Sequence, residues 1–231
     1  MKNKILLLFL AVLFLIPSVA FAEETGETAV QTDATYEMAK ALVEVISPDM
    51  DLPAELDATI SRAQFTTAMV SLLGINLPEK METGFSDVPA SDSAAASIGY
   101  AKQIGAVSSG TLFYPEDDIT YMQAVKMIVA TAGYMPQAEI NGGYPNGYVL
   151  AAATAGLTNG VRGNSMNVRN AVVMFYNLLT ADMMQQTGFG ENVTYEVVRD
   201  KNILTENHKM YKVKGIVTAN DDTALTSVSA K

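Results

Sequence analysis

The chain has 231 residues, of which 49% are hydrophobic, with 25 acidic and 15 basic side chains, one histidine and no cysteine. The missing cysteine excludes disulfide-stapled folds, thiolate-ligated metal centres and cysteine nucleophiles. A net charge of −10 argues against a nucleic-acid partner, because that role requires clustered Lys and Arg side chains that neutralise phosphates. The length allows one or two domains with a sizeable core.

The N-terminus is typical of a secretory signal peptide. Lys2 and Lys4 precede an apolar run from Ile5 to Ile16, and Ala20-Phe21-Ala22 presents small residues at the positions that a signal peptidase reads. The apolar run is short for a membrane span. We therefore expect residues 1–22 to be removed, which leaves an exported chain without a transmembrane anchor.

A helical pattern then recurs three times along the chain. Ser61 with Gln64, and Thr120 with Gln123, match the S/T-x-x-Q capping box, and Asn167 is a good N-cap at the third place. Another predicted helix precedes each capped helix, over residues 36–46, 94–104 and 148–155. The sequence therefore predicts three tandem helix-loop-helix repeats.

Charge and periodicity both change near Gly188. Residues 23–188 carry 19 acidic and 7 basic side chains, whereas residues 189–231 carry 6 of each. The segments Val193–Val198 and Met210–Thr218 alternate as strands do, and Asn220-Asp221-Asp222 reads as a turn. We assign residues 1–22 to the signal peptide, 23–83, 84–135 and 136–188 to the three repeats, and 189–231 to an incomplete β-rich segment.

The order of the motifs resembles the S-layer homology domain of bacterial surface proteins. Phe85-Ser86-Asp87-Val88-Pro89 resembles the family's opening Phe-x-Asp-Val-Pro, Phe113-Tyr114-Pro115 its Phe-x-Pro loop, and Ile60-Ser61-Arg62-Ala63-Gln64 its Ile-Thr-Arg-Ala-Glu signature. The third repeat is similar to a variant found in Firmicutes surface proteins. The resemblance implies a mainly α fold, a pseudo-threefold bundle of three helix-loop-helix repeats, followed here by the start of a β-strand-rich segment.

The resemblance also implies a function, non-covalent attachment to the cell wall. In this family, grooves between repeats bind secondary cell-wall polysaccharide that carries a ketal-linked pyruvate, and the signature arginine contacts the carboxylate. An arginine in the first turn of a helix adds a planar charged fork to exposed backbone N–H groups, so both favour an anion. The candidate polysaccharide-binding residues are Arg62, Ser61, Gln64, Arg162 and Arg169, with Arg62 the best of them.

Departures from the family pattern reduce the number of expected sites. Tyr121 stands in the arginine position of the second repeat, Arg169 is one position late behind Val168, and the tryptophan expected near Ser93 is missing. We expect one or two competent grooves. The ordinary alternative for Arg62 is a solvated first-turn residue. Because the acidic chain cannot attract an anionic polymer by its overall field, recognition must be local.

Other polar groups suggest no catalytic or metal chemistry. Glu116-Asp117-Asp118 could ligate calcium, although acids before a helix more often serve its dipole. His208 has no evident partner, and we expect it to be exposed. We expect no enzyme activity, cofactor or metal, and three functions stay open. These are a secreted cell-wall anchor, an S-layer or assembly module that contacts other S-layer proteins and no glycan, and the anchor of an exported hydrolase whose catalytic domain is absent here.

Overall fold

The computed structural model describes residues 33–188 and 193–211. Over these residues the chain is mainly helical with one small two-stranded sheet, which confirms the predicted fold class. In these two ranges no helix is long and apolar enough to cross a membrane. The predicted signal peptide and the predicted turn at residues 220–222 lie outside the described residues.

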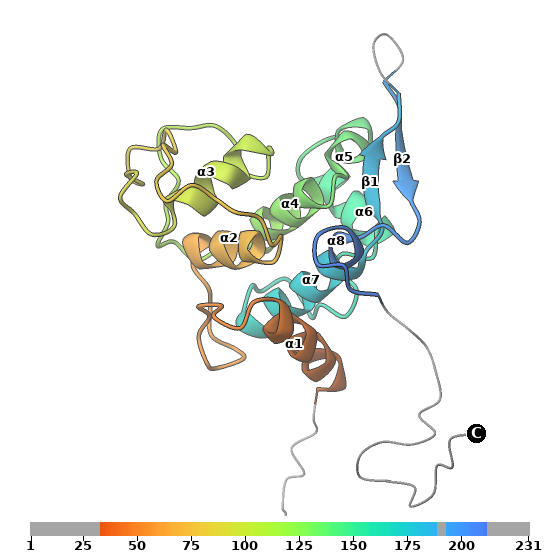
Figure 1. Cartoon of the computed structure of the whole chain (residues 1–231), viewed down its shortest axis with the longest axis horizontal. Helices are drawn as coiled ribbons and strands as arrows, with labels where there is room; N and C mark the ends of the chain where they lie inside the picture. Colours follow the sequence, from red (N-terminus) through yellow and green to blue (C-terminus); the bar gives the residue numbers. More distant parts are fainter. Residues whose placement is uncertain (1–32, 189–192, 212–231) are drawn as a thin grey trace, which may run out of the picture. The chain divides into compact units, whose positions relative to one another are not determined.

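Three helix pairs follow the three predicted repeats (Figure 1). The first helices of the pairs are α1 (Ala34–Ile46), α3 (Ala95–Gln103) and α6 (Asn146–Thr154). The second helices are α2 (Arg62–Ser71), α4 (Tyr121–Thr131) and α7 (Val168–Thr180). A short helix that the sequence did not predict, α5 (Met135–Ile140), lies between α4 and α6.

The second helices begin where the capping residues place them. The Ser61 hydroxyl accepts the backbone N–H of Gln64 at 3.1 Å, and the Gln64 side chain accepts the N–H of Ser61 at 3.0 Å. Thr120 and Gln123 form the same reciprocal pair. Asn167 accepts the N–H of Asn170 at 3.0 Å. Each cap satisfies a backbone donor that the first turn leaves without a helical partner, which fixes the first residue of the helix.

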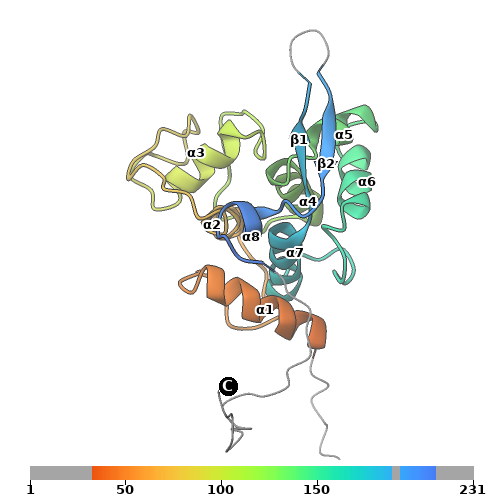
Figure 2. The same ribbon diagram turned by 45° about the vertical axis from the view of Figure 1, so that its right-hand side comes forward.

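The repeats pack in a cycle, because each second helix lies against the first helix of the next repeat (Figures 1 and 2). Thus α2 packs on α3, α4 packs on α6, and α7 returns to α1, while α4 contacts both α2 and α7. Backbone bonds tie the junctions: the N–H of Arg62 donates to Asp117 O at 2.9 Å, and the N–H of Val168 donates to Ala58 O at 3.1 Å. This is the arrangement expected of a pseudo-threefold bundle, and it builds grooves from parts of two or more repeats.

The core lies where the three second helices meet. The rings of Phe65 on α2 and Phe175 on α7 have centroids 5.0 Å apart, and Met69, Ile128 and Leu178 are fully buried with them. Burying an apolar side chain of this size stabilises the fold by about 1.5–3 kcal/mol. The cycle is therefore held mainly by apolar side chains of its three central helices.

A short hairpin follows α7. Strand β1 (Met183–Gln186) pairs antiparallel with β2 (Tyr195–Val198). Strand β2 agrees with the predicted strand at residues 193–198, but β1 lies before Gly188, so the sheet spans the predicted boundary. An isolated hairpin is marginal in water. Here the N–H of Met184 donates to Ala132 O at 3.2 Å, which ties the hairpin to the end of α4.

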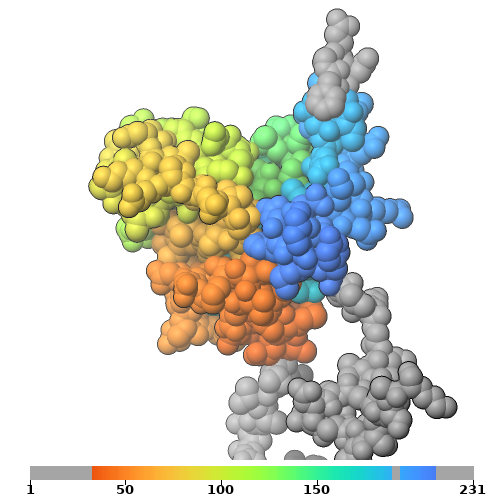
Figure 3. All heavy atoms as spheres, viewed as in Figure 1, coloured from red at the N-terminus to blue at the C-terminus, as the bar shows by residue number. Residues whose placement is uncertain are grey.

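The segment after the hairpin closes the C-terminal end of α2. After helix α8 (Ile203–Glu206), the Asn207 amide donates to Leu73 O at 2.7 Å and His208 Nε2 lies 2.7 Å from Leu72 O. These carbonyls have no partner within their own helix. Figure 3 shows this dark-blue segment packed against the chain's earlier residues. The expectation that His208 is exposed was wrong, since the ring is half-buried against α2.

Candidate functional site

One open groove, the α4 groove, combines cationic and aromatic side chains. It has a volume of 590 Å³ and is formed by the first turns of α4, the loop before α4, and single residues from the first and third repeats. The residues that line it include Arg62, Phe85, Ser108, Leu112, Phe113, Tyr114, Asp117, Asp118, Thr120, Gln123, Lys126 and Tyr144. The best candidate from the sequence, Arg62, therefore lines a groove that is built mainly by the second repeat, although Arg62 itself belongs to the first repeat.

The carbonyl and the ring of Phe113 hold the side chain of Arg62 in place. It is the first residue of α2, and its Nε donates to Phe113 O at 2.9 Å while its guanidinium lies 4.6 Å from the centre of the Phe113 ring. No hydrogen bond to its two terminal nitrogens is found among the described residues. Burial lowers the pKa of Arg62, and the charges of Asp117 and Asp87 oppose this shift. A guanidinium stays charged at neutral pH, so it offers a pre-oriented cation.

Asp87 fixes the loop that Arg62 leans on. Its carboxylate accepts the N–H of Phe113 at 2.9 Å and the N–H of Tyr114 at 2.7 Å. Burial raises the pKa of Asp87, but these N–H groups outweigh it and hold the pKa below its usual value. The ring centroids of Phe85 and Phe113 lie 5.6 Å apart. These contacts hold the Phe85–Pro89 motif against the Phe113–Pro115 motif. We call the contact group of Phe85, Asp87, Phe113 and Tyr114 the clasp.

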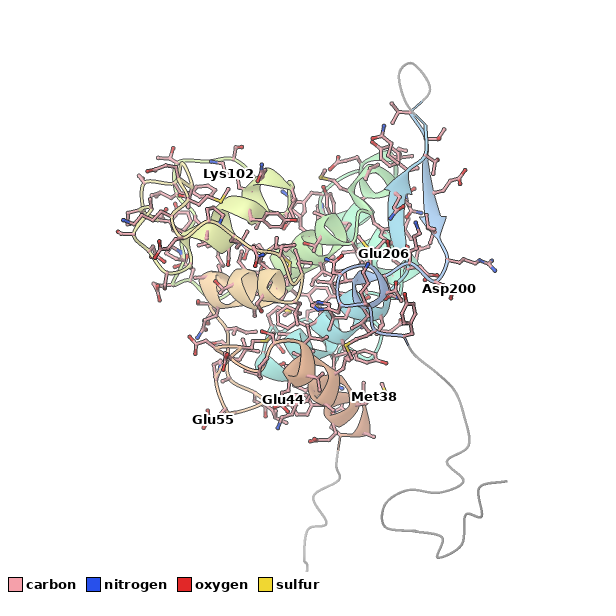
Figure 4. The ribbon with its side chains drawn as sticks, viewed as in Figure 1. Met38, Glu44, Glu55, Lys102, Asp200 and Glu206 are labelled. Carbon is pink, nitrogen blue, oxygen red and sulfur yellow. The ribbon has the colours of Figure 1, made fainter. Side chains whose placement is uncertain are left out.

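Lys102 on α3 also contacts the clasp, through Phe85. The Lys102 ammonium lies 4.3 Å from the centre of the Phe85 ring and donates to Thr83 O at 2.8 Å. Figure 4 labels Lys102 on α3, at the edge of the second repeat. Lys102, Phe85, Phe113 and Arg62 thus form a stack in which each cation covers a ring, an arrangement worth about 0.5–2 kcal/mol per contact.

Lys126 supplies a second cation to the α4 groove. Its ammonium donates to the Ser108 hydroxyl and lies 5.9 Å from the centre of the Tyr144 ring. Burial lowers the pKa of Lys126, while the charge of Glu139 opposes the shift. Sequence reasoning missed this residue, although Lys126 lies three positions after Gln123, one turn along the exposed face of the same helix.

Two tyrosines border the groove with accessible rings. Tyr144 is 51% exposed and Tyr114 is 54% exposed. Tyr114 adopts a left-handed backbone with φ of 60°, which is uncommon for a residue other than glycine and costs on the order of 1 kcal/mol. The Asp87 carboxylate holds this residue through its N–H. Exposed rings beside two cations suit a ligand that has both an anionic group and an apolar ring face.

Two of the predicted site residues line a different groove. Ser61 and Gln64 border the α2 groove, a hollow of 530 Å³ between the first turns of α2 and residues 92–94 and 115–116. Their side chains are engaged in the capping box. This groove is acidic, since Asp49, Asp51, Asp92 and Glu116 line it. The structure therefore separates Ser61 and Gln64 from the side chain of Arg62.

The two arginines of the third repeat are both paired with Asp33. Arg169, whose side chain is only 7% exposed, donates from Nε to Asp33 Oδ2 at 2.8 Å. Arg162 is 69% exposed, and its Nη1 lies 3.1 Å from the same oxygen. Neither arginine borders the α4 groove. Their contact with a polysaccharide stays a prediction, and the geometry gives it no support.

The acids before α4 do not gather into a cation site. Within residues 33–188 and 193–211, no group of three or more His, Asp and Glu side chains is arranged to hold a metal ion. Asp117 accepts the N–H of Arg62 through its backbone carbonyl, and its side chain borders the α4 groove with that of Asp118. The helix-dipole interpretation of these acids needs no bound ion.

The chain is similar to bacterial cell-surface proteins. It is 29% identical over 203 residues to the surface layer protein of Brevibacillus choshinensis, an alignment that covers 83% of this chain and 18% of that protein. It is 28% identical over 152 residues to the middle cell wall protein of Brevibacillus brevis, covering 63% of this chain and 14% of that protein. The chain thus spans less than a fifth of the length of these relatives. No family model matches it.

Proposed function

We propose that this chain is a non-enzymatic module that attaches an exported protein to the bacterial cell wall by binding an anionic wall polysaccharide in the α4 groove. Arg62 and Lys126 would hold the anionic group, and Tyr144 and Tyr114 would lie against sugar rings. Sugar rings present apolar C–H faces, and a tyrosine ring covers such a face at low conformational cost. A ketal-linked pyruvate is the anionic group that the family resemblance suggests.

One observation supports the proposal above the others, the orientation of Arg62. Its Nε is anchored on Phe113 O and its flat face on the Phe113 ring, and the side chain borders the groove with no described hydrogen bond from its terminal nitrogens. A simple solvated arginine would not need this support. Because the chain is acidic overall, a cation fixed in advance is what an anionic polymer requires.

The similarity to a surface layer protein favours one alternative, an assembly module that contacts other protein subunits and binds no glycan. The acidic α2 groove and the α4 groove would then be protein-contact surfaces. Wall binding separates the two functions, because an assembly module needs protein partners and an anchor needs only the polymer.

The test is a binding assay with purified cell-wall polymer, prepared with and without its acidic substituents. Arg62→Ala and Lys126→Ala should each weaken binding by about 10-fold to 100-fold, because each removes a charge-assisted hydrogen bond worth about 1.5–3 kcal/mol. Polymer stripped of its acidic groups should bind the unaltered chain at least as weakly as intact polymer binds either variant, because it loses the contacts to both cations.

The matched control is Arg199→Ala, which makes the same change of charge at an exposed position after β2. It should leave wall binding unchanged. Full wall binding by the Arg62→Ala and Lys126→Ala variants would remove the α4 groove as the site, and no wall binding by the unaltered chain would favour the assembly alternative.

A further inference from the structure

The α7 cluster consists of Arg169 in the first turn of α7, Arg162 in the preceding loop and Asp33 just before α1, and it contains a complete carboxylate contact. Arg169 donates to both oxygens of Asp33, from Nε at 2.8 Å and from Nη2 at 3.4 Å. Arg162 approaches Oδ2 of the same carboxylate at 3.1 Å. A two-pronged contact from one guanidinium, with a second arginine beside it, is the arrangement that recognises a carboxylate group.

The surroundings of Arg169 are built to hold it. Its Nη1 donates to Gly160 O at 2.5 Å and to the Asn170 side chain at 3.1 Å. Asn170 in turn donates to Arg162 O at 2.8 Å, which fixes the loop. A β-carbon at Gly160 would lie 2.9 Å from a methyl group of Thr35. The loop and the start of α1 are therefore in close contact at Gly160.

The location of Asp33 corresponds to a groove wall in the other repeats. The residues just before the first helix of the next repeat border each groove: Tyr144 before α6 borders the α4 groove, and Asp92 before α3 borders the α2 groove. Asp33 directly precedes α1 and caps it, accepting the N–H of Tyr36 at 3.3 Å. Since α7 packs on α1 as α4 packs on α6, Asp33 and Tyr144 both lie just before the first helix of the repeat that follows in the cycle.

We propose that Arg169 and Arg162 form a carboxylate-binding site that the chain fills with its own Asp33, which closes this site to an outside carboxylate. The bound group comes from the same chain, 136 residues away from Arg169 in sequence. Hydrogen bonds from Arg169 keep the pKa of Asp33 below its usual value, so the carboxylate is charged when it occupies the site. If the proposed wall-binding function also holds, an outside anion binds in the α4 groove and not beside Arg169.

A chemical-rescue experiment tests this closure without any wall polymer. Asp33→Ser keeps an N-cap hydroxyl for α1 but removes the carboxylate, so it leaves a vacancy beside Arg169 and Arg162. Formate and acetate should raise the melting temperature of this variant by a few degrees and in a saturable way, as expected for a ligand that binds only the folded state. The unaltered chain should show no such rise.

Two controls make the result specific. Asp33→Asn keeps both the cap and a side chain of the same size, so it should block the vacancy and give no response to formate. Adding Arg169→Gln to Asp33→Ser should abolish the rescue. Chloride at equal ionic strength corrects for screening. A response of the Asp33→Ser variant to formate no larger than its response to chloride would overturn the proposal, and so would a saturable response of the unaltered chain.

The outcome does not depend on the proposed wall-binding function. Rescue by formate with no wall binding would retain the closed carboxylate site and reject the anchor. Wall binding without rescue would do the reverse. If Asp33→Ser does not fold, Asp33→Gly takes its place in the rescue experiment, because glycine is also tolerated at an N-cap, and a formate response no larger than the chloride response would again overturn the proposal.

Discussion

Two arginines lie in the first turns of second helices, and one borders an open groove while the other is buried in an ion pair. Arg62 is the first residue of α2 and borders an open groove with Lys126 and two exposed tyrosines. Arg169 is the second residue of α7 and is buried against Asp33. One position along a helix turns a side chain by about 100°, so the two arginines face different neighbours. The comparison shows that a first-turn arginine is available to a ligand only if the adjacent repeat places no carboxylate against its guanidinium group.

The largest expected effect comes from breaking the buried pair. Arg169→Ala should lower the free energy of unfolding by about 3–5 kcal/mol, because it leaves the carboxylate of Asp33 poorly compensated and removes the bonds to Gly160 and Asn170. Urea denaturation followed by circular dichroism measures this change. Arg62→Ala should cost much less, since its terminal nitrogens face the groove.

The exposed partner of the same carboxylate provides the control. Arg162→Ala removes an ion pair whose arginine is 69% exposed, so the loss should stay under about 1 kcal/mol. If Arg162→Ala destabilises the chain more than Arg169→Ala, the two arginines have been assigned the wrong roles.

The next effect concerns the clasp of the α4 groove. Asp87→Asn replaces a charged acceptor of two backbone N–H groups by a neutral one, and should cost about 1–3 kcal/mol of stability. It should also weaken wall binding although Asp87 is not among the groove-lining residues, because the loop that carries Phe113 and Tyr114 loosens. Polymer affinity and urea denaturation are measured on the same protein.

A loop carboxylate elsewhere separates these two consequences. Asp92 accepts the N–H of Ala94 at 2.8 Å, close to the start of α3, and borders the α2 groove. Asp92→Asn should therefore leave wall binding unchanged. Equal loss of binding in the two variants would argue that the Asp87 clasp has no special connection with the site.

A smaller effect is expected at the aromatic wall. Tyr144→Ala should weaken wall binding by roughly 3-fold to 10-fold, in line with about 0.5–1.5 kcal/mol for a favourable ring contact. Tyr144→Phe keeps the ring and should bind nearly as well as the unaltered chain. Equal losses in the two variants would assign the contribution of Tyr144 to its hydroxyl instead of its ring.

The smallest effect is a dependence on pH. Hydrogen bonds from Arg169 lower the pKa of Asp33 below the ordinary value of 3.8. The stabilisation from this carboxylate is therefore fully present above pH 3.8 and is lost as the pH falls through the lower folded-state pKa. The stability difference between the unaltered chain and Asp33→Asn should be constant near neutral pH and shrink in acid. A difference that grew in acid would contradict the pairing.

The helices and their caps could be predicted from the sequence because they depend on local chemistry. Ser61 with Gln64 and Thr120 with Gln123 are three residues apart, and each pair determines where its own helix begins. Strand β1 was missed because its residues have no alternating pattern, and pairing with β2 stabilises it. The environment of His208 could not be predicted either, since its partner is a carbonyl on α2, 136 residues away.

The site could be predicted only in part, for the same physical reason. Arg62 followed from its motif, but Lys126 and Tyr144 join it only because the repeats pack in a cycle. The sequence also made Arg169 a candidate, one position late in the motif, and its pairing with Asp33 depends on α7 lying against α1. A motif thus identifies a side chain with the right chemistry, whereas the packing of repeats decides whether a ligand can reach it.

The most direct test of this account is hydrogen exchange of the whole chain with and without purified acidic wall polymer. The α4 groove and the α7 cluster are then compared in one sample. The account predicts slower exchange in residues 107–118, which contain most of the lining of the α4 groove, and around Tyr144, with no change in residues 158–163 beside the α7 cluster. Protection confined to residues 158–163, with none around Arg62 and Lys126, would contradict it.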